Sequence, residues 1–102
     1  MIVIEKNEGP KIPYEVTGKK ITFDDDLTIN LSKRQADEPV HIDICYDRFE
    51  DLVIGAAAGR AYVAELDLPA KVYETTGEGD EAETHALPLD MDEVTLTLWA
   101  VE

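Results

Sequence analysis

The chain has 102 residues, which is enough for one domain and too few for two. Its 23 acidic and 9 basic side chains give a formal net charge of −14, and such a surface repels the phosphates of DNA and RNA. A hydrophobic content of 44% is typical of globular proteins, and the single cysteine, Cys45, excludes an intramolecular disulfide. We therefore expect one globular domain, residues 1–102, that does not bind nucleic acid directly.

The first residues are apolar, Met1 to Ile4, but Glu5 ends the run. A run of this length is too short for the apolar core of a signal peptide. No later apolar stretch approaches the ~18 residues that a membrane-spanning helix needs. An unpaired cysteine also fits a reducing compartment. These features predict a cytoplasmic protein without a membrane partner.

Hydrophobic and polar residues alternate with a period of two along most of the chain, and this is the signature of half-buried β-strands. The alternation is clearest in three stretches, and weaker versions fill much of the remainder. The predicted strands, with the three clearest given first, are residues 27–32, 40–47, 94–101, 2–6, 13–17, 19–23, 60–67, 70–75 and 84–89.

Turn residues separate these strands. Gly18-Lys19 is a two-residue hairpin signal, because glycine accepts a positive φ. Asp24-Asp25-Asp26 predicts a second turn, since short carboxylate side chains bond to nearby backbone amides. Pro69 marks an edge strand, a bulge or a strand boundary, because proline cannot donate a ladder hydrogen bond. Residues 76–81 form the most polar, glycine-rich segment and predict a mobile hairpin tip.

One segment has helical spacing. The apolar residues at positions 49, 52, 53, 56 and 57 follow the i, i+3, i+4 pattern of an amphipathic helix. Asp47 with Glu50 resembles a capping box, and Gly59 is suitably placed to end the helix. Val53, Ile54 and Gly55 are poor helix formers and oppose this interpretation. We expect a small antiparallel β-sandwich or barrel, mostly β, with at most one short helix near residues 48–58.

Two C-terminal stretches are similar to a known kind of protein. Residues 62–74, YVAELDLPAKVYE, and residues 88–99, PLDMDEVTLTLW, resemble short uncharacterised bacterial proteins of prophage-like gene clusters. The resemblance covers roughly the C-terminal two fifths of the chain. It implies an accessory or structural protein of a mobile element. It implies no activity and transfers no functional residue to this sequence.

His41, Asp43, Cys45 and Asp47 alternate along one predicted strand, and all four are metal-ligand types. Neighbours on the same face of a strand lie ~6.5–7 Å apart, so one ion would reach only two of them. A real site would need ligands from a neighbouring strand, and His85 is the only other histidine. We therefore predict a solvated polar face with no metal site and no cofactor.

No signature of catalysis stands out in the sequence. There is no phosphate-binding glycine loop, and nothing local marks Cys45 as a reactive thiol. We expect a protein that is not an enzyme and that binds no small molecule. Its predicted function is that of a structural or protein-interaction module, and the resemblance implies a prophage-type accessory or assembly protein.

The predicted partner is another protein or a second copy of the chain. Contact is expected through an exposed edge strand, or through the 94–101 strand with Trp99 if that side chain is not in the core. Two alternative functions remain open. An acidic inhibitor that imitates nucleic acid would use the net charge of −14. A small metal-binding or thiol enzyme would use His41 and Cys45.

Overall fold

The computed structural model describes residues 1–56 and 61–101, and within them the chain is mostly β, as predicted. The described strands are β1 (Ile2–Glu5), β2 (Tyr14–Thr17), β3 (Lys20–Phe23), β4 (Leu27–Asn30), β5 (Val40–Tyr46), β6 (Leu52–Ile54), β7 (Ala61–Leu68), β8 (Tyr73–Thr76), β9 (Glu83–Ala86) and β10 (Thr95–Leu98). One helical turn, α1 (Leu31–Arg34), and two 3₁₀ turns, Gly79–Glu81 and Met91–Glu93, complete the described elements. Among these residues no helix has the length and apolar character needed to cross a bilayer.

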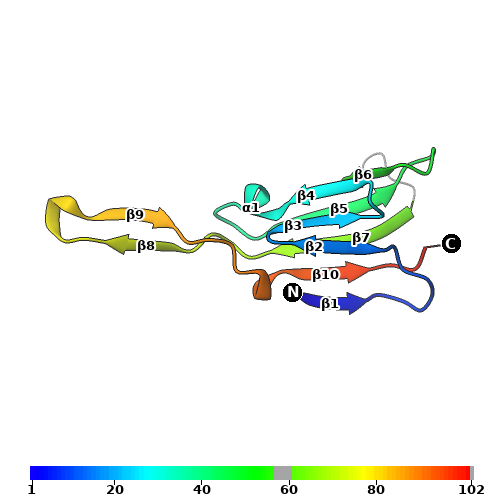
Figure 1. The fold of residues 1–102 in the computed structure, drawn as a ribbon, viewed down its shortest axis with the longest axis horizontal. Helices are drawn as coiled ribbons and strands as arrows, with labels where there is room; N and C mark the ends of the chain where they lie inside the picture. The colour runs from blue at the N-terminus through cyan, green and yellow to red at the C-terminus, as the bar shows by residue number, and fades with distance from the viewer. Residues whose placement is uncertain (57–60, 102) are drawn as a thin grey trace.

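The strands form three sheets (Figure 1). The largest has five strands in the order β1-β10-β7-β5-β6, the second has β2-β3-β4, and the third is the β8–β9 hairpin. All described pairs are antiparallel except β1 with β10, which is parallel. The expectation of an antiparallel sheet therefore needs this one correction. β10 lies between β1 and β7, so it is an inner strand of its sheet.

The five-stranded and three-stranded sheets pack face to face and share one hydrophobic core. The small sheet contributes the fully buried Ile21 and Phe23, and the large sheet contributes the fully buried Ile44, Leu66 and Leu96. On β3 and β10, for example, every second residue is buried in this layer, because side chains on a strand point to opposite faces. The arrangement is an open sandwich, and the described strands of neither sheet close into a barrel.

The predicted turns at Gly18-Lys19 and Asp24-Asp25-Asp26 and the predicted break at Pro69 are confirmed, and Asp26 N donates to Phe23 O at 2.9 Å in the second turn. Gly18 has a φ of 59° and joins β2 to β3, with Thr17 and Lys20 as the last paired residues. A positive φ of this size favours glycine, which has no Cβ to clash with the backbone. Pro69 follows the last residue of β7 directly, as expected for a residue without a backbone N–H.

The prediction of a helix near residues 48–58 is wrong over the described residues 48–56, and residues 57–58 lie outside them. Asp47 does bond to local backbone amides, but its Oδ1 accepts from Phe49 N at 2.8 Å and from Asp51 N at 3.0 Å within a tight turn. Glu50 has a φ of 65°, which ends any helical path. Residues 52–54 then pair with β5 as strand β6, as the β-branched side chains of Val53 and Ile54 favour.

The short helix α1 lies elsewhere, at Leu31–Arg34, where a continued strand was expected. Asn30 caps it, because its Oδ1 accepts from Lys33 N at 3.3 Å. Leu31 is fully buried and anchors the turn to the core. Leu31, the last apolar residue of the alternating run, therefore begins α1 and is not part of strand β4.

The β8–β9 hairpin extends away from the sandwich along the long axis of the molecule (Figure 1). The molecule measures 58 Å along this axis and only 24 and 21 Å across it. The hairpin and its tip occupy the polar segment in which a hairpin tip was predicted. The mobility of that tip stays a prediction.

Candidate functional site

Two central strands of the large sheet bring four polar side chains together on one face. In the register of β5 and β7, His41 lies opposite Asp67, and Asp43 lies opposite Glu65. The residues between them, Ile42 and Leu66, are buried on the opposite face. Directly opposed side chains in an antiparallel pair approach to ~4.5–5.5 Å at Cβ. The strand pairing therefore assembles a cluster of one imidazole and three carboxyl groups, the His41 cluster.

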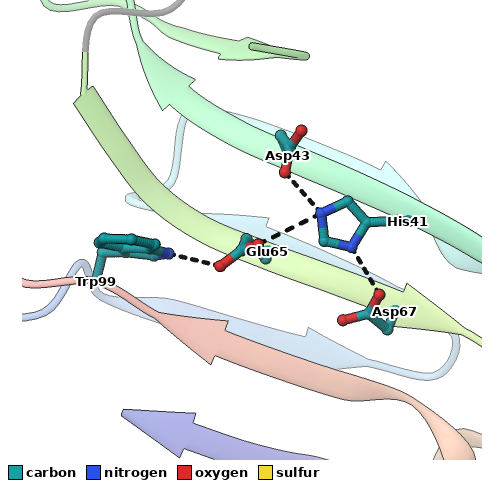
Figure 2. A network of polar contacts seen from close by, with 5 residues as sticks. All are labelled: His41, Asp43, Glu65, Asp67 and Trp99. Atoms are coloured by element: carbon teal, nitrogen blue, oxygen red, sulfur yellow. Dashed lines mark hydrogen bonds and ion pairs between the residues drawn. The ribbon is translucent and has the colours of Figure 1, made fainter. Parts of the chain in front are cut away.

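Both ring nitrogens of His41 contact carboxylate oxygens (Figure 2). Nδ1 lies 2.6 Å from Oδ1 of Asp67, and Nε2 lies 2.7 Å from Oδ1 of Asp43. Nε2 also lies 3.4 Å from Oε1 of Glu65. The ligand atoms of His41, Asp43 and Glu65 all fall within 4.8 Å of one another. These three side chains thus point at one small volume.

Trp99, which follows the end of β10, contacts the His41 cluster through Glu65. Its indole Nε1 donates to Oε2 of Glu65 at 2.7 Å, so the two oxygens of Glu65 contact different partners. The indole ring stacks on Tyr62 with 5.2 Å between ring centroids, and the Lys6 ammonium lies 5.6 Å from the Trp99 ring. Trp99 is half-buried and forms no part of the fully buried core.

The carboxylates favour the positively charged form of His41. Its pKa is raised above the ordinary value of 6.5, chiefly by the hydrogen bond to Asp67, and the contacts with Asp43 add to this effect. Burial acts in the opposite direction, but the side chain is 47% exposed, which limits that effect. Three carboxylates around one imidazole keep the local charge negative even when His41 is protonated. The cluster is therefore a site that favours a cation.

The His41→Gln substitution should destabilise the protein most at low pH. Because the folded pKa of His41 lies above its unfolded value, the stabilisation is complete below pH 6.5 and is lost as pH rises through the folded pKa. Urea unfolding in metal-free buffer at a series of pH values will measure the difference between wild type and variant. The Asp67→Asn variant should show a weaker pH dependence, because it removes the main acceptor. A difference that is constant or grows toward pH ~9 would contradict this assignment.

The other two members of the predicted polar face lie apart from this cluster. Cys45 is a free thiol that is only 2% exposed, and burial is the main cause that raises its pKa, with Asp43 and Glu65 adding to it. A buried thiol with a raised pKa is a poor nucleophile. Asp47 holds the turn after β5. A register irregularity between Ile44 and Cys45 interrupts the alternation that the sequence implied.

The neighbouring strand β7 contributes Glu65 and Asp67 to the cluster, whereas His85 was the residue that the sequence suggested as a further ligand. Glu65 and Asp67 were not singled out from the sequence, although they alternate with buried residues on β7 in the same way as His41 and Asp43 on β5. His85 lies on β9 in the projecting hairpin, 3.9 Å from Oε2 of Glu74. The sequence showed the alternation along each strand, but it did not show the register in which the two strands pair.

The projecting hairpin is the second candidate site. Every residue of β8 and β9 is exposed, and among the described strands the two form a sheet only with each other. Leu87 N donates to Val72 O at 2.7 Å across the base of the hairpin, and the Tyr73 hydroxyl attaches the hairpin to the rest of the domain by donating to Asp37. Val72 is 60% exposed and Tyr73 is 49% exposed. The hairpin therefore leaves two open strand edges and an apolar base in solvent.

Comparison of the chain with protein-family models, with curated proteins and with solved structures finds no match.

Proposed function

We propose that the chain is a non-catalytic protein-interaction module, of the accessory or assembly type found in prophage-like gene clusters, and that it binds its partner through the β8–β9 hairpin. The observation that carries this proposal is that the hairpin projects from the sandwich and buries none of its strand residues (Figure 1). An isolated two-stranded hairpin is marginally stable in water. Contact with another protein would supply the burial that the hairpin lacks within its own chain.

Backbone pairing is the mode of binding that the hairpin favours. Within residues 1–56 and 61–101, β8 and β9 are each paired on one side only, so their outer N–H and C=O groups are available to a strand of another protein. By contrast, β10 is paired on both sides, and the Trp99 side chain is engaged with Glu65 and Tyr62. The hairpin is therefore a better binding element than the 94–101 segment expected from the sequence.

The charge of the hairpin defines the chemistry of the partner. Residues 72–87 hold five acidic side chains and no lysine or arginine: Glu74, Glu78, Asp80, Glu81 and Glu83. Pairing with the hairpin of a second copy would bring like charges together, which is unfavourable. A strand edge flanked by lysine or arginine would complement the hairpin. We infer a basic partner protein, with binding that weakens as ionic strength rises.

The proposal places the protein in the cytoplasm. The single thiol, Cys45, is free and buried, as suits a chain that folds without a disulfide. The net charge of −14 disfavours nucleic acid as the direct partner.

Site-specific photo-crosslinking in the native host tests this proposal. A photoreactive amino acid at the exposed, uncharged Ala82 should capture one basic protein that, once purified, binds the wild-type chain saturably. The matched control carries the same group at Phe49, which is 69% exposed in the β5–β6 turn at the other end of the molecule. Capture of the same protein from position 49 and not from position 82 would reject the hairpin as the binding element.

A further inference from the structure

Both ring nitrogens of His41 face carboxylate oxygens, but a neutral imidazole has only one N–H group to donate. A neutral imidazole carries one N–H and one lone pair, whereas a carboxylate only accepts hydrogen bonds. If Nδ1 donates to Asp67, the lone pair on Nε2 faces Oδ1 of Asp43 at 2.7 Å and Oε1 of Glu65 at 3.4 Å. Three electron-rich atoms then meet with nothing positive between them. The position requires either a second proton on the ring or a metal cation.

Two further hydrogen bonds, between His41 and Asp67 and between Trp99 and Glu65, favour a metal cation over a second proton. Metal-binding histidines commonly donate their other N–H to a carboxylate, which fixes the tautomer and the orientation of the ring, and Asp67 is placed to accept it. Ligating carboxylates are commonly held by hydrogen bonds of their own, and the Trp99 indole holds Oε2 of Glu65 at 2.7 Å. These two contacts engage Nδ1 of His41 and Oε2 of Glu65, and they leave Nε2 of His41 and Oε1 of Glu65 directed at the same volume (Figure 2).

We propose that Nε2 of His41, Oδ1 of Asp43 and Oε1 of Glu65 bind one divalent transition-metal ion, with zinc as the best match. Zinc binds imidazole and carboxylate ligands at ~2.0–2.2 Å, so ligand atoms of a tetrahedral site lie about 3.3–3.5 Å apart. The 3.4 Å separation of Nε2 and Oε1 fits this value, whereas Oδ1 of Asp43, now 2.7 Å from Nε2, must move outward by about 0.6–0.8 Å. Calcium requires six to eight oxygen ligands and no imidazole, which makes it a poorer fit.

The ion would join two strands of the sheet. His41 and Asp43 lie on β5, and Glu65 lies on β7, so the bound cation crosslinks the central pair and neutralises part of the clustered negative charge. The exposed ring leaves room for water at the remaining coordination position. This role is independent of partner binding by the hairpin, and either proposal could fail without the other.

Titration of EDTA-treated protein with zinc chloride tests the site. The chain has one tryptophan, Trp99, and its indole bonds to a proposed ligand, so its fluorescence should report binding. We expect a saturable one-to-one change and a higher melting temperature with zinc, and much weaker responses to magnesium and calcium. His41→Gln and Asp43→Asn should each weaken zinc binding at least ~10-fold, and Asp67→Asn by ~10–100-fold. His85→Gln, in the hairpin, is the matched control and should bind as wild type does.

Circular dichroism will establish whether each variant is folded. If His41→Gln is not folded, zinc binding by the folded Asp43→Asn variant tests the site. The absence of a saturable zinc response in the folded wild type would overturn the proposal. Unchanged zinc binding in the folded His41→Gln or Asp43→Asn variants would do the same. Equal responses to magnesium and zinc would reject a transition-metal site.

Discussion

Replacement of Phe23 by alanine should destabilise the protein by about 3–5 kcal/mol. Phe23 is fully buried on β3 of the small sheet, within the core that this sheet shares with the large one. The substitution removes the apolar contacts of the ring and leaves a cavity that the neighbouring strands fill only in part. Because domains of this size are stable by only about 5–15 kcal/mol, the loss is a large share of the total.

Urea unfolding followed by Trp99 fluorescence will measure this change. Phe49→Ala is the matched control, because it removes the same ring from a position that is 69% exposed. The control should change the free energy of unfolding by no more than ~0.5 kcal/mol. A loss below ~1 kcal/mol for Phe23→Ala would mean that the two sheets do not pack through this residue.

Removal of the hairpin should abolish partner binding and leave the sandwich folded. Tyr73 and Ala86 are directly paired at the base of the hairpin, so an Asn-Gly turn can replace residues 74–85 and close the chain at that pair. This design keeps the hydrogen bond from the Tyr73 hydroxyl to Asp37. The deleted residues are all exposed and belong to no part of the core. Loop-closure entropy also depends only weakly on length, so stability should change little.

The expected pair of results is a melting temperature within a few degrees of wild type and no detectable binding to the crosslinked partner. A variant in which Glu78 and Glu81 are replaced by glutamine serves as an intermediate control. It keeps the strands and removes part of the charge, so binding should weaken without being lost. Full binding by the shortened chain would place the interface elsewhere.

The clearest strands were predictable from the sequence because their buried residues alternate with more exposed ones. The alternation at residues 27–32, 40–47 and 94–101 corresponds to β4, β5 and β10. Turn chemistry at Gly18 and Pro69 also sets local backbone geometry without reference to distant residues. The mostly β class and the approximate strand positions therefore follow from local patterns.

The remaining features depend on contacts between distant parts of the chain. Helical spacing in residues 49–57 was misleading, because pairing of β6 with β5 outweighs a weak local preference. The parallel pairing of β1 with β10 joins the two ends of the chain, and no local signal specifies it. The His41 cluster depends on the β5–β7 register, since a shift of one residue would move Glu65 and Asp67 to the opposite face.

Hydrogen–deuterium exchange with and without the crosslinked partner tests the central claim most directly. None of the strands that the structure describes pairs with the outer amides of β8 and β9, and backbone pairing with a bound protein would protect these amides. The account predicts new protection in residues 73–86 and little change in the sandwich. The competing site is the outer edge of β1, where Ile2, Val3 and Ile4 are about half exposed. Protection of residues 2–5 with none in the hairpin would contradict the account.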